Sequence, residues 1–406
     1  MTPALRAVLA IGEYRRLVAM RVLTSLALPM LMVAIGWHIY DLTHDPVDLG
    51  LVGLTLFLPQ VALTLPAGHI ADVIDRRLVM LCCYGLLTLD ALLLAAFALS
   101  GLRHTAPIFA VMLLQACATS FLRPASQSLL PQLVPKELLP SAVAFSSSSW
   151  QMASIAGPAL GGLLFTFGAS VVYGLVAILM AAVALVATGL TPRPPVALVV
   201  ESGVVDRLLA GVHFVRQRPI LLGAISLDLF AVLFGGATAL LPVFARDILA
   251  VGPWGLGLLR SAPAAGALVC GLFLAHYPLQ RHAGRVMFLC VTGFGLCTIL
   301  FGLSRSLSLS LFTLAALGAC DMVSIFVRQT LVQINTPDEM RGRVAAVSSL
   351  FIGASNELGE FESGITAGWF GTVPAVVLGG IGTLSVVLIW SLLFPSLRKI
   401  DRLDQS

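Results

Sequence analysis

Twelve apolar runs alternate with short polar segments along the chain. About 20 apolar residues are needed for a helix to cross the hydrocarbon core of a bilayer, so each run predicts one membrane-spanning helix. The pattern therefore predicts an all-α membrane protein with twelve transmembrane helices. The first six helices are expected at 17–41, 48–72, 77–100, 106–128, 141–168 and 170–190, and the second six at 220–246, 253–277, 284–303, 308–331, 343–369 and 371–394.

The longest polar stretch, 191–219, divides the two sets of six helices. We expect an N-terminal bundle over 1–190, a cytoplasmic linker over 191–219, and a C-terminal bundle with a short cytoplasmic tail over 220–406. The middle of the linker is expected to form a short amphipathic helix at the membrane surface. A repeat with a shift of 202 residues supports two related halves, because it aligns Gly157 with Gly359 and Gly162 with Gly364.

Composition excludes a soluble protein. Of the 406 residues, 58% are hydrophobic and 11% are charged, whereas a soluble domain carries roughly 25% charged residues. All but four of the 24 basic residues fall on one side of the predicted helices, which predicts that both termini are cytoplasmic. The first apolar run is longer than a signal-peptide core, so it is expected to be retained as a helix.

Several function classes lack their signatures. The sequence has no phosphate-binding loop, nucleophile elbow or nucleic-acid motif, so we expect neither an enzyme, nor an ATP-driven pump, nor a nucleic-acid-binding protein. The seven cysteines all lie in apolar runs, and we interpret them as small buried hydrophobic residues rather than disulfides or metal ligands. No metal site and no cofactor are expected.

The segment 68–77 joins the second and third predicted helices. Gly68 and Asp72 are four residues apart and share a helix face, where a glycine lets a neighbouring helix come close. Arg76 and Arg77 follow at the water boundary. We predict a latch in which Asp72 approaches the start of the eleventh helix; the alternative is that the arginines only set the topology.

The proposed receiving end of the latch is the start of the eleventh helix. Arg341 and Arg343 lie there, and a helix N-terminus favours an anion. In the fifth helix, Gly157 and Pro158 predict a bend and a close helix contact, with gating or simple packing as the alternative roles.

Ionisable residues within apolar helices are costly and are candidates for function. Asp228 and Asp321 are expected near the midplane of the seventh and tenth helices, with Arg123 as the nearest cation by depth. Arg328 is expected to reach the membrane surface from its helix end. Asp90 of the third helix is expected to be a hydrogen-bond partner between helices.

The eleventh helix carries three carboxylates in six residues. Glu357 and Glu360 share one face, and Glu362 points elsewhere. They cannot all be ionised in hydrocarbon. At least one is expected to bind a proton or substrate, unless they only form hydrogen bonds within the kinked helix and with its neighbours.

The loop pattern at Gly68, Asp72, Arg76 and Arg77 resembles the signature of the major facilitator superfamily. Val73 and Asp75 depart from it, standing where a basic residue and a glycine are usual. The segments 36–43, 130–135, 337–343 and 359–364 resemble the branch of enterobactin-type siderophore exporters.

This resemblance implies a fold of two six-helix bundles in which helices one, four, seven and ten line the pathway. It also implies proton-driven export of a small organic molecule by alternating access, from a monomer in the cytoplasmic (inner) membrane. The expected partners are protons, substrate and the lipid bilayer. A broad-specificity drug efflux pump and a transport-inactive membrane sensor or scaffold remain alternatives.

Overall fold

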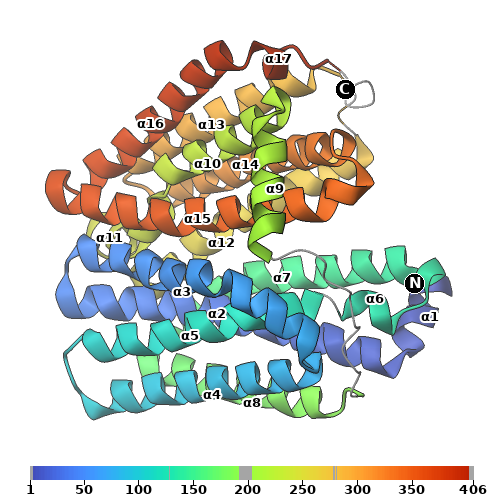
Figure 1. Ribbon diagram of the computed structural model, residues 1–406. Helices are drawn as coiled ribbons and strands as arrows, with labels where there is room; N and C mark the ends of the chain where they lie inside the picture. The colour runs from blue at the N-terminus through green and yellow to red at the C-terminus, as the bar shows by residue number, and fades with distance from the viewer. Residues whose placement is uncertain (1–2, 128, 192–203, 278, 280, 402–406) are drawn as a thin grey trace. The chain divides into compact units, whose positions relative to one another are not determined.

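The computed structural model describes residues 3–127, 129–191, 204–277, 279 and 281–401. The elements up to residue 188 are α1 (Pro3–Ala10), α2 (Gly12–Thr43), α3 (Pro46–Val73), α4 (Arg76–Ser100), α5 (Ala106–Gln127), α6 (Leu130–Leu133), η1 (Lys136–Leu138), α7 (Leu139–Phe165) and α8 (Ala169–Thr188) (Figure 1). They continue with α9 (Val204–Arg216), α10 (Pro219–Phe234), η2 (Ala237–Leu240), α11 (Leu241–Val243), η3 (Phe244–Ile248), α12 (Gly252–His276), α13 (Ala283–Leu303), α14 (Leu307–Ile334), α15 (Asp338–Phe370), α16 (Thr372–Leu393) and α17 (Pro395–Arg398).

The described residues form helices and connections, with no strand among them. In the part of the chain that the structure describes, ten helical segments are long and apolar enough to cross a membrane. α7 and α15 are also long enough, but they fall outside this set because serines interrupt α7 and charged residues interrupt α15. These two helices and the ten apolar segments correspond in order to the twelve predicted spans.

One predicted helix differs from the structure, and the difference has a local cause. The seventh predicted helix, 220–246, is interrupted after Phe234, where Gly235 and Gly236 precede the 3₁₀ turn η2 and the π-helical turn η3. Glycine weakens a helix interior because it has no side chain to restrict the backbone. In the predicted linker, 192–203 lies outside the described residues, while the expected short helix is present as α9.

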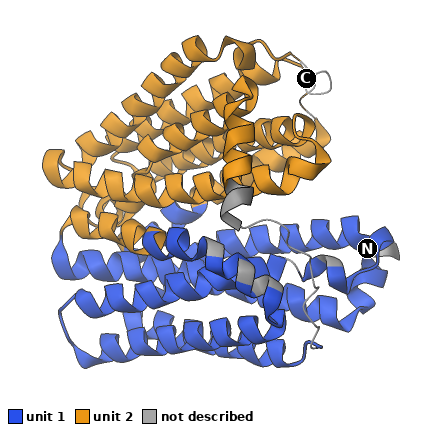
Figure 2. Ribbon diagram, in the orientation of Figure 1, with its two compact units in different colours: residues 1–44, 58–200, 253–261 blue, residues 45–57, 201–252, 262–406 orange. Residues whose placement is uncertain are grey.

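The chain divides into two compact units (Figure 2). Unit 1 comprises 1–44, 58–200 and 253–261, and unit 2 comprises 45–57, 201–252 and 262–406. α3 and α12 are each divided between the units. The first part of α3 belongs to unit 2 and the first part of α12 belongs to unit 1.

Glycines aligned by the sequence repeat make matching contacts in the two units. In unit 1, a Cβ on Gly162 of α7 would lie 2.7 Å from the Cα of Gly257 in α12. In unit 2, Gly364 of α15 lies against Gly50 of α3, whose own Cβ would come within 2.9 Å of the Gly364 Cα. Both contacts join helix backbones directly, which only small residues permit.

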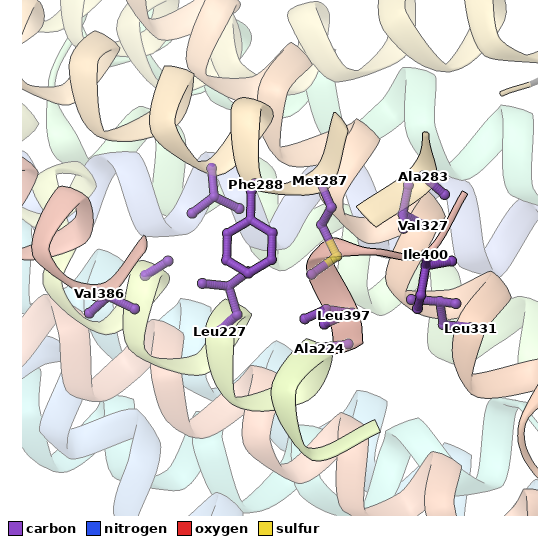
Figure 3. Packing of buried hydrophobic residues seen from close by; sticks show 12 residues of the cluster. Ala224, Leu227, Ala283, Met287, Phe288, Val327, Leu331, Val386, Leu397 and Ile400 are labelled. Atoms are coloured by element: carbon purple, nitrogen blue, oxygen red, sulfur yellow. The ribbon is translucent and has the colours of Figure 1, made fainter. Parts of the chain in front are cut away.

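The core of unit 2 is formed by side chains of α10, α13, α14, α16 and the C-terminal segment (Figure 3). Leu227 of α10 belongs to the same cluster as Phe288 of α13 and Val327 of α14. The polar residues Asp228 and Arg328 directly follow Leu227 and Val327 in the sequence. The apolar cluster thus packs α10 and α14 together at the positions of these two polar residues.

Candidate functional site

Asp228 of α10 and Arg328 of α14 form a buried ion pair. Oδ2 of Asp228 lies 3.2 Å from Nη2 of Arg328, and the residues are 6% and 2% exposed. The expectation that Arg328 extends to the membrane surface is therefore wrong, because its guanidinium turns inward to a carboxylate. Nε of Arg328 is buried and has no hydrogen-bond partner among the described residues.

Asp321 adds a second carboxyl group to this site. It lies seven residues before Arg328 on α14, two helical turns away on the same face. Its carboxyl is close enough to interact electrostatically with Asp228 and Arg328, and the residue is partly buried. The Arg328 guanidinium thus pairs with Asp228 and is within electrostatic range of a second carboxyl group, that of Asp321.

Arg123 belongs to unit 1, whereas the two aspartates belong to unit 2, and its side chain is exposed. The cation that pairs with Asp228 is Arg328, while the substrate or proton role expected for Arg123 stays a prediction. Depth along a helix was a poor guide here because it does not specify which helices pack together.

The carboxylate segment of α15 packs on the first part of α3 within unit 2. A Cβ on Gly53 would lie 2.5 Å from the carbonyl oxygen of Glu357 and 2.8 Å from the Cβ of Glu360. Both glutamates are partly buried. This contact places them at a close helix crossing, while their proton or substrate role stays a prediction.

Glu362 is held by its own helix. Thr366, one turn later, donates a hydrogen bond of 2.9 Å to Oε1 of Glu362, and the neighbouring Ser363 hydroxyl lies 3.5 Å from Oε2. These local bonds occupy both carboxylate oxygens. They favour the alternative in which Glu362 forms hydrogen bonds within α15, and its proton or substrate role stays a prediction.

The segment 68–77 contains a helix cap that the sequence pattern did not reveal. Oδ1 of Asp75 accepts a 2.9 Å hydrogen bond from the backbone N–H of Arg77 and caps the start of α4. The Arg77 guanidinium donates to the carbonyl oxygen of Thr188 at the end of α8. Arg77 therefore joins two helices of unit 1, and its charge lies at a helix C-terminus, where a cation is favourable.

The other gating candidates are Asp72, Gly68, Arg341 and Arg343, and the structure describes the surroundings of the last three. The Asp72 side chain lies outside the described residues, so its predicted latch stays a prediction. Arg341 pairs at 2.7 Å with Asp338 of its own helix, and Nη1 of Arg343 lies 3.4 Å from the Met340 sulfur. A Cβ on Gly68 would meet no heavy atom of the described residues within 4 Å, so the close helix contact expected there is not found.

The α7 motif makes the close contacts that its small residues predict. A Cβ on Gly157 would lie 2.7 Å from the carbonyl oxygen of Leu26 in α2. Next to it, the carbonyl oxygen of Pro158 would lie 2.6 Å from a Cβ on Gly257 of α12. α7 is therefore packed against α2 on one side and the first part of α12 on the other, within unit 1.

A family model described as "transmembrane secretion effector" matches residues 5–406. The chain belongs to the transmembrane secretion effector family. It is 26% identical over 399 residues to the enterobactin exporter EntS of Shigella boydii serotype 4 (strain Sb227), covering 95% of this chain and 92% of the relative. It is 27% identical over 397 residues to EntS of Escherichia coli O81 (strain ED1a), with the same coverage.

Solved structures show the same fold. The nucleoside transporter NupG matches with a TM-score of 0.70 at 15% identity, over 94% of this chain and 98% of that chain. A POT family transporter in complex with 5-aminolevulinic acid matches with a TM-score of 0.73 at 12% identity, over 95% and 96%. The chain thus has the major facilitator fold, and its family membership identifies it as a membrane transporter.

Arg21, a partly buried cation inside unit 1, was not among the predicted site residues. Arg21 of α2 donates hydrogen bonds to the Ser126 carbonyl oxygen at 2.8 Å and to the Ser146 hydroxyl at 3.1 Å. Its partners in the described residues are neutral, and none is a carboxylate. The position of Arg21 inside the first apolar run could have marked it as a candidate site residue. In the sequence it contributes only to the count of basic residues that predicts which side is cytoplasmic.

Asp90 also differs from its expected role. It is 0% exposed, and neither carboxyl oxygen has a hydrogen-bond partner among the described residues. The predicted hydrogen bond between helices is therefore not found. Its surroundings on α4 are apolar, with Leu87, Ala91 and Leu94 buried on the same helix.

Proposed function

We propose that this secretion effector exports a small, siderophore-like organic molecule from the cytoplasm by proton-coupled alternating access. The observation that carries the proposal is the Asp228–Arg328–Asp321 group inside the helices of unit 2. Charges inside a membrane protein are expensive and mark ion or substrate pathways. The names of the curated relatives support export and a siderophore-like cargo.

The balance of charges in this buried group supports proton coupling. Arg328 neutralises one carboxylate, and Asp228 is its partner at 3.2 Å. A second ionised carboxyl nearby would be an uncompensated charge in a desolvated site, so Asp321 is the group proposed to carry the transported proton. When Asp321 releases its proton, it competes with Asp228 for Arg328.

Substrate recognition is proposed to use the same cation. Nε of Arg328 is a buried donor with no partner among the described residues, and a guanidinium can bind an oxygen anion through a charge-assisted hydrogen bond. An anionic substrate oxygen would then replace one carboxylate in the charge balance. This exchange links substrate binding to proton movement without requiring a cofactor.

The proposal also covers the membrane location, the oligomeric state and the domains of the chain. We place the chain in the cytoplasmic membrane as a monomer, with both termini and 191–219 on the cytoplasmic side, as the basic residues predict. The domains are proposed as 1–190 and 220–406. The latch of Asp72 with the start of α15 is proposed to stabilise the state that is closed to the cytoplasm.

Counterflow in proteoliposomes tests the transport function. Vesicles preloaded with unlabelled enterobactin should accumulate radiolabelled enterobactin, and ethidium should compete poorly. Strong competition by ethidium would favour a drug efflux pump. Binding of enterobactin without counterflow would favour a membrane sensor and would overturn the export proposal.

A further inference from the structure

Four of the seven cysteines gather in unit 2, although they are spread over 51 positions of the sequence from 270 to 320. They come from three helices: Cys270 of α12, Cys290 and Cys297 of α13, and Cys320 of α14. All four are free thiols. A Cβ on Gly271, next to Cys270, would lie 3.4 Å from Cε of Met322 on α14, so α12 packs on α14 close to Cys320.

The centre of this thiol cluster is a notch on α13. Cys290, Gly293 and Cys297 are spaced by three and four residues, so they follow one helix face. Sγ of Cys320 lies 2.9 Å from the position that a Cβ on Gly293 would occupy. The sulfur thus fills the space left by the glycine, with a cysteine of α13 one turn before it and another one turn after it.

The four cysteines were expected to be small buried hydrophobic residues, but all four are partly exposed. Apolar side chains at these positions could only pack against one another. Thiols that lie close together can also bind a metal ion. Thiolates are soft ligands that select soft cations such as Cu(I). No three metal-binding side chains of the described residues are arranged to hold one ion, which disfavours a tetrahedral zinc site.

We propose that Cys320, together with Cys290 or Cys297, forms a two-coordinate site for a soft d¹⁰ cation of the Cu(I) and Ag(I) class. The ion would bridge α13 and α14. Binding converts two thiols to thiolates and releases two protons for each monovalent cation, with no change in oxidation state. Either α13 cysteine can be the second ligand, because each lies one helical turn from Gly293, against which the Cys320 sulfur packs.

Silver is a suitable probe because it is soft and does not change oxidation state in air. The purified full-length protein is reduced, freed of reductant and chloride, and titrated with silver nitrate in detergent. Unbound silver is removed by desalting, bound silver is measured by mass spectrometry of the metal, and silver–sulfur coordination is measured by X-ray absorption. The proposal expects tight binding of one ion per chain with two sulfur neighbours.

Matched variants decide where the ion binds. Cys117→Ser, in α5 of unit 1, should keep the tight site, whereas Cys320→Ser should lose it. The double variant Cys290→Ser and Cys297→Ser keeps Cys320 and should also lose the site, so the test does not depend on the folding of one variant. Silver binding that persists in both, or that falls equally in Cys117→Ser, would overturn the proposal.

Discussion

The carboxylate of Asp228 and the guanidinium of Arg328 lie 3.2 Å apart between α10 and α14, and both residues are almost completely buried. Each charge is compensated by the other inside an apolar cluster that includes Leu227 and Val327. Burying two charges carries a large desolvation cost, so such a pair is weak support for stability alone. Its position among membrane helices is consistent with the role in transport that we propose for it.

Breaking this pair should destabilise the protein. Arg328→Met leaves Asp228 without its partner, and the loss should be roughly 3–5 kcal/mol in unfolding free energy if the carboxylate stays charged. The double variant Asp228→Asn and Arg328→Met should recover part of this loss. Thermal unfolding of the purified variants measures both effects, and Asp338→Asn, which removes an exposed pair with Arg341, is the control with a small effect.

The glycine crossing in unit 2 should tolerate no large side chain. Gly364→Leu would place atoms into the backbone of Gly50, and overpacking costs about 1–3 kcal/mol or more. Gly174→Leu is the matched control because a Cβ there meets no atom of the described residues within 4 Å. Size-exclusion chromatography and thermal unfolding should show a destabilised Gly364→Leu and a nearly unchanged Gly174→Leu.

Asp75 should act as a helix cap and not as part of a charge relay. Asp75→Ala removes the acceptor for the Arg77 N–H and should cost about 1 kcal/mol, whereas Asp75→Ser retains a capping oxygen and should cost less. Both variants should transport substrate normally once folded. Loss of counterflow in a stable Asp75→Ser protein would instead assign Asp75 a role in gating.

Asp72→Asn tests the predicted latch. The amide keeps the size of the side chain but removes the charge that a helix N-terminus and arginines favour. The variant should fold normally, shift the balance of states toward the one open to the cytoplasm, and slow transport. Distances between spin labels in the two units would measure this balance, and an unchanged distribution together with unchanged counterflow would argue against the latch.

The number and order of the helices could be predicted because the bilayer imposes a minimum apolar length on each span. The site could be predicted only in part. Asp228 and Asp321 are predicted as charges in apolar runs, but a single sequence does not show that Arg328 turns toward Asp228, since that depends on how α14 packs on α10. The clustering of Cys320 with Cys290 and Cys297 was hidden for the same reason.

The most direct test of the account is pH-driven transport by Asp321→Asn in proteoliposomes. This variant leaves the Asp228–Arg328 pair intact, and Asp90→Asn, which removes a buried carboxyl from the other unit, is the control. We expect Asp321→Asn to lose substrate accumulation driven by a pH gradient but to keep substrate exchange at equal pH. We expect Asp90→Asn to keep both activities. Gradient-driven accumulation by Asp321→Asn at the rate of the unmodified protein would contradict the proposed role of Asp321 in proton coupling.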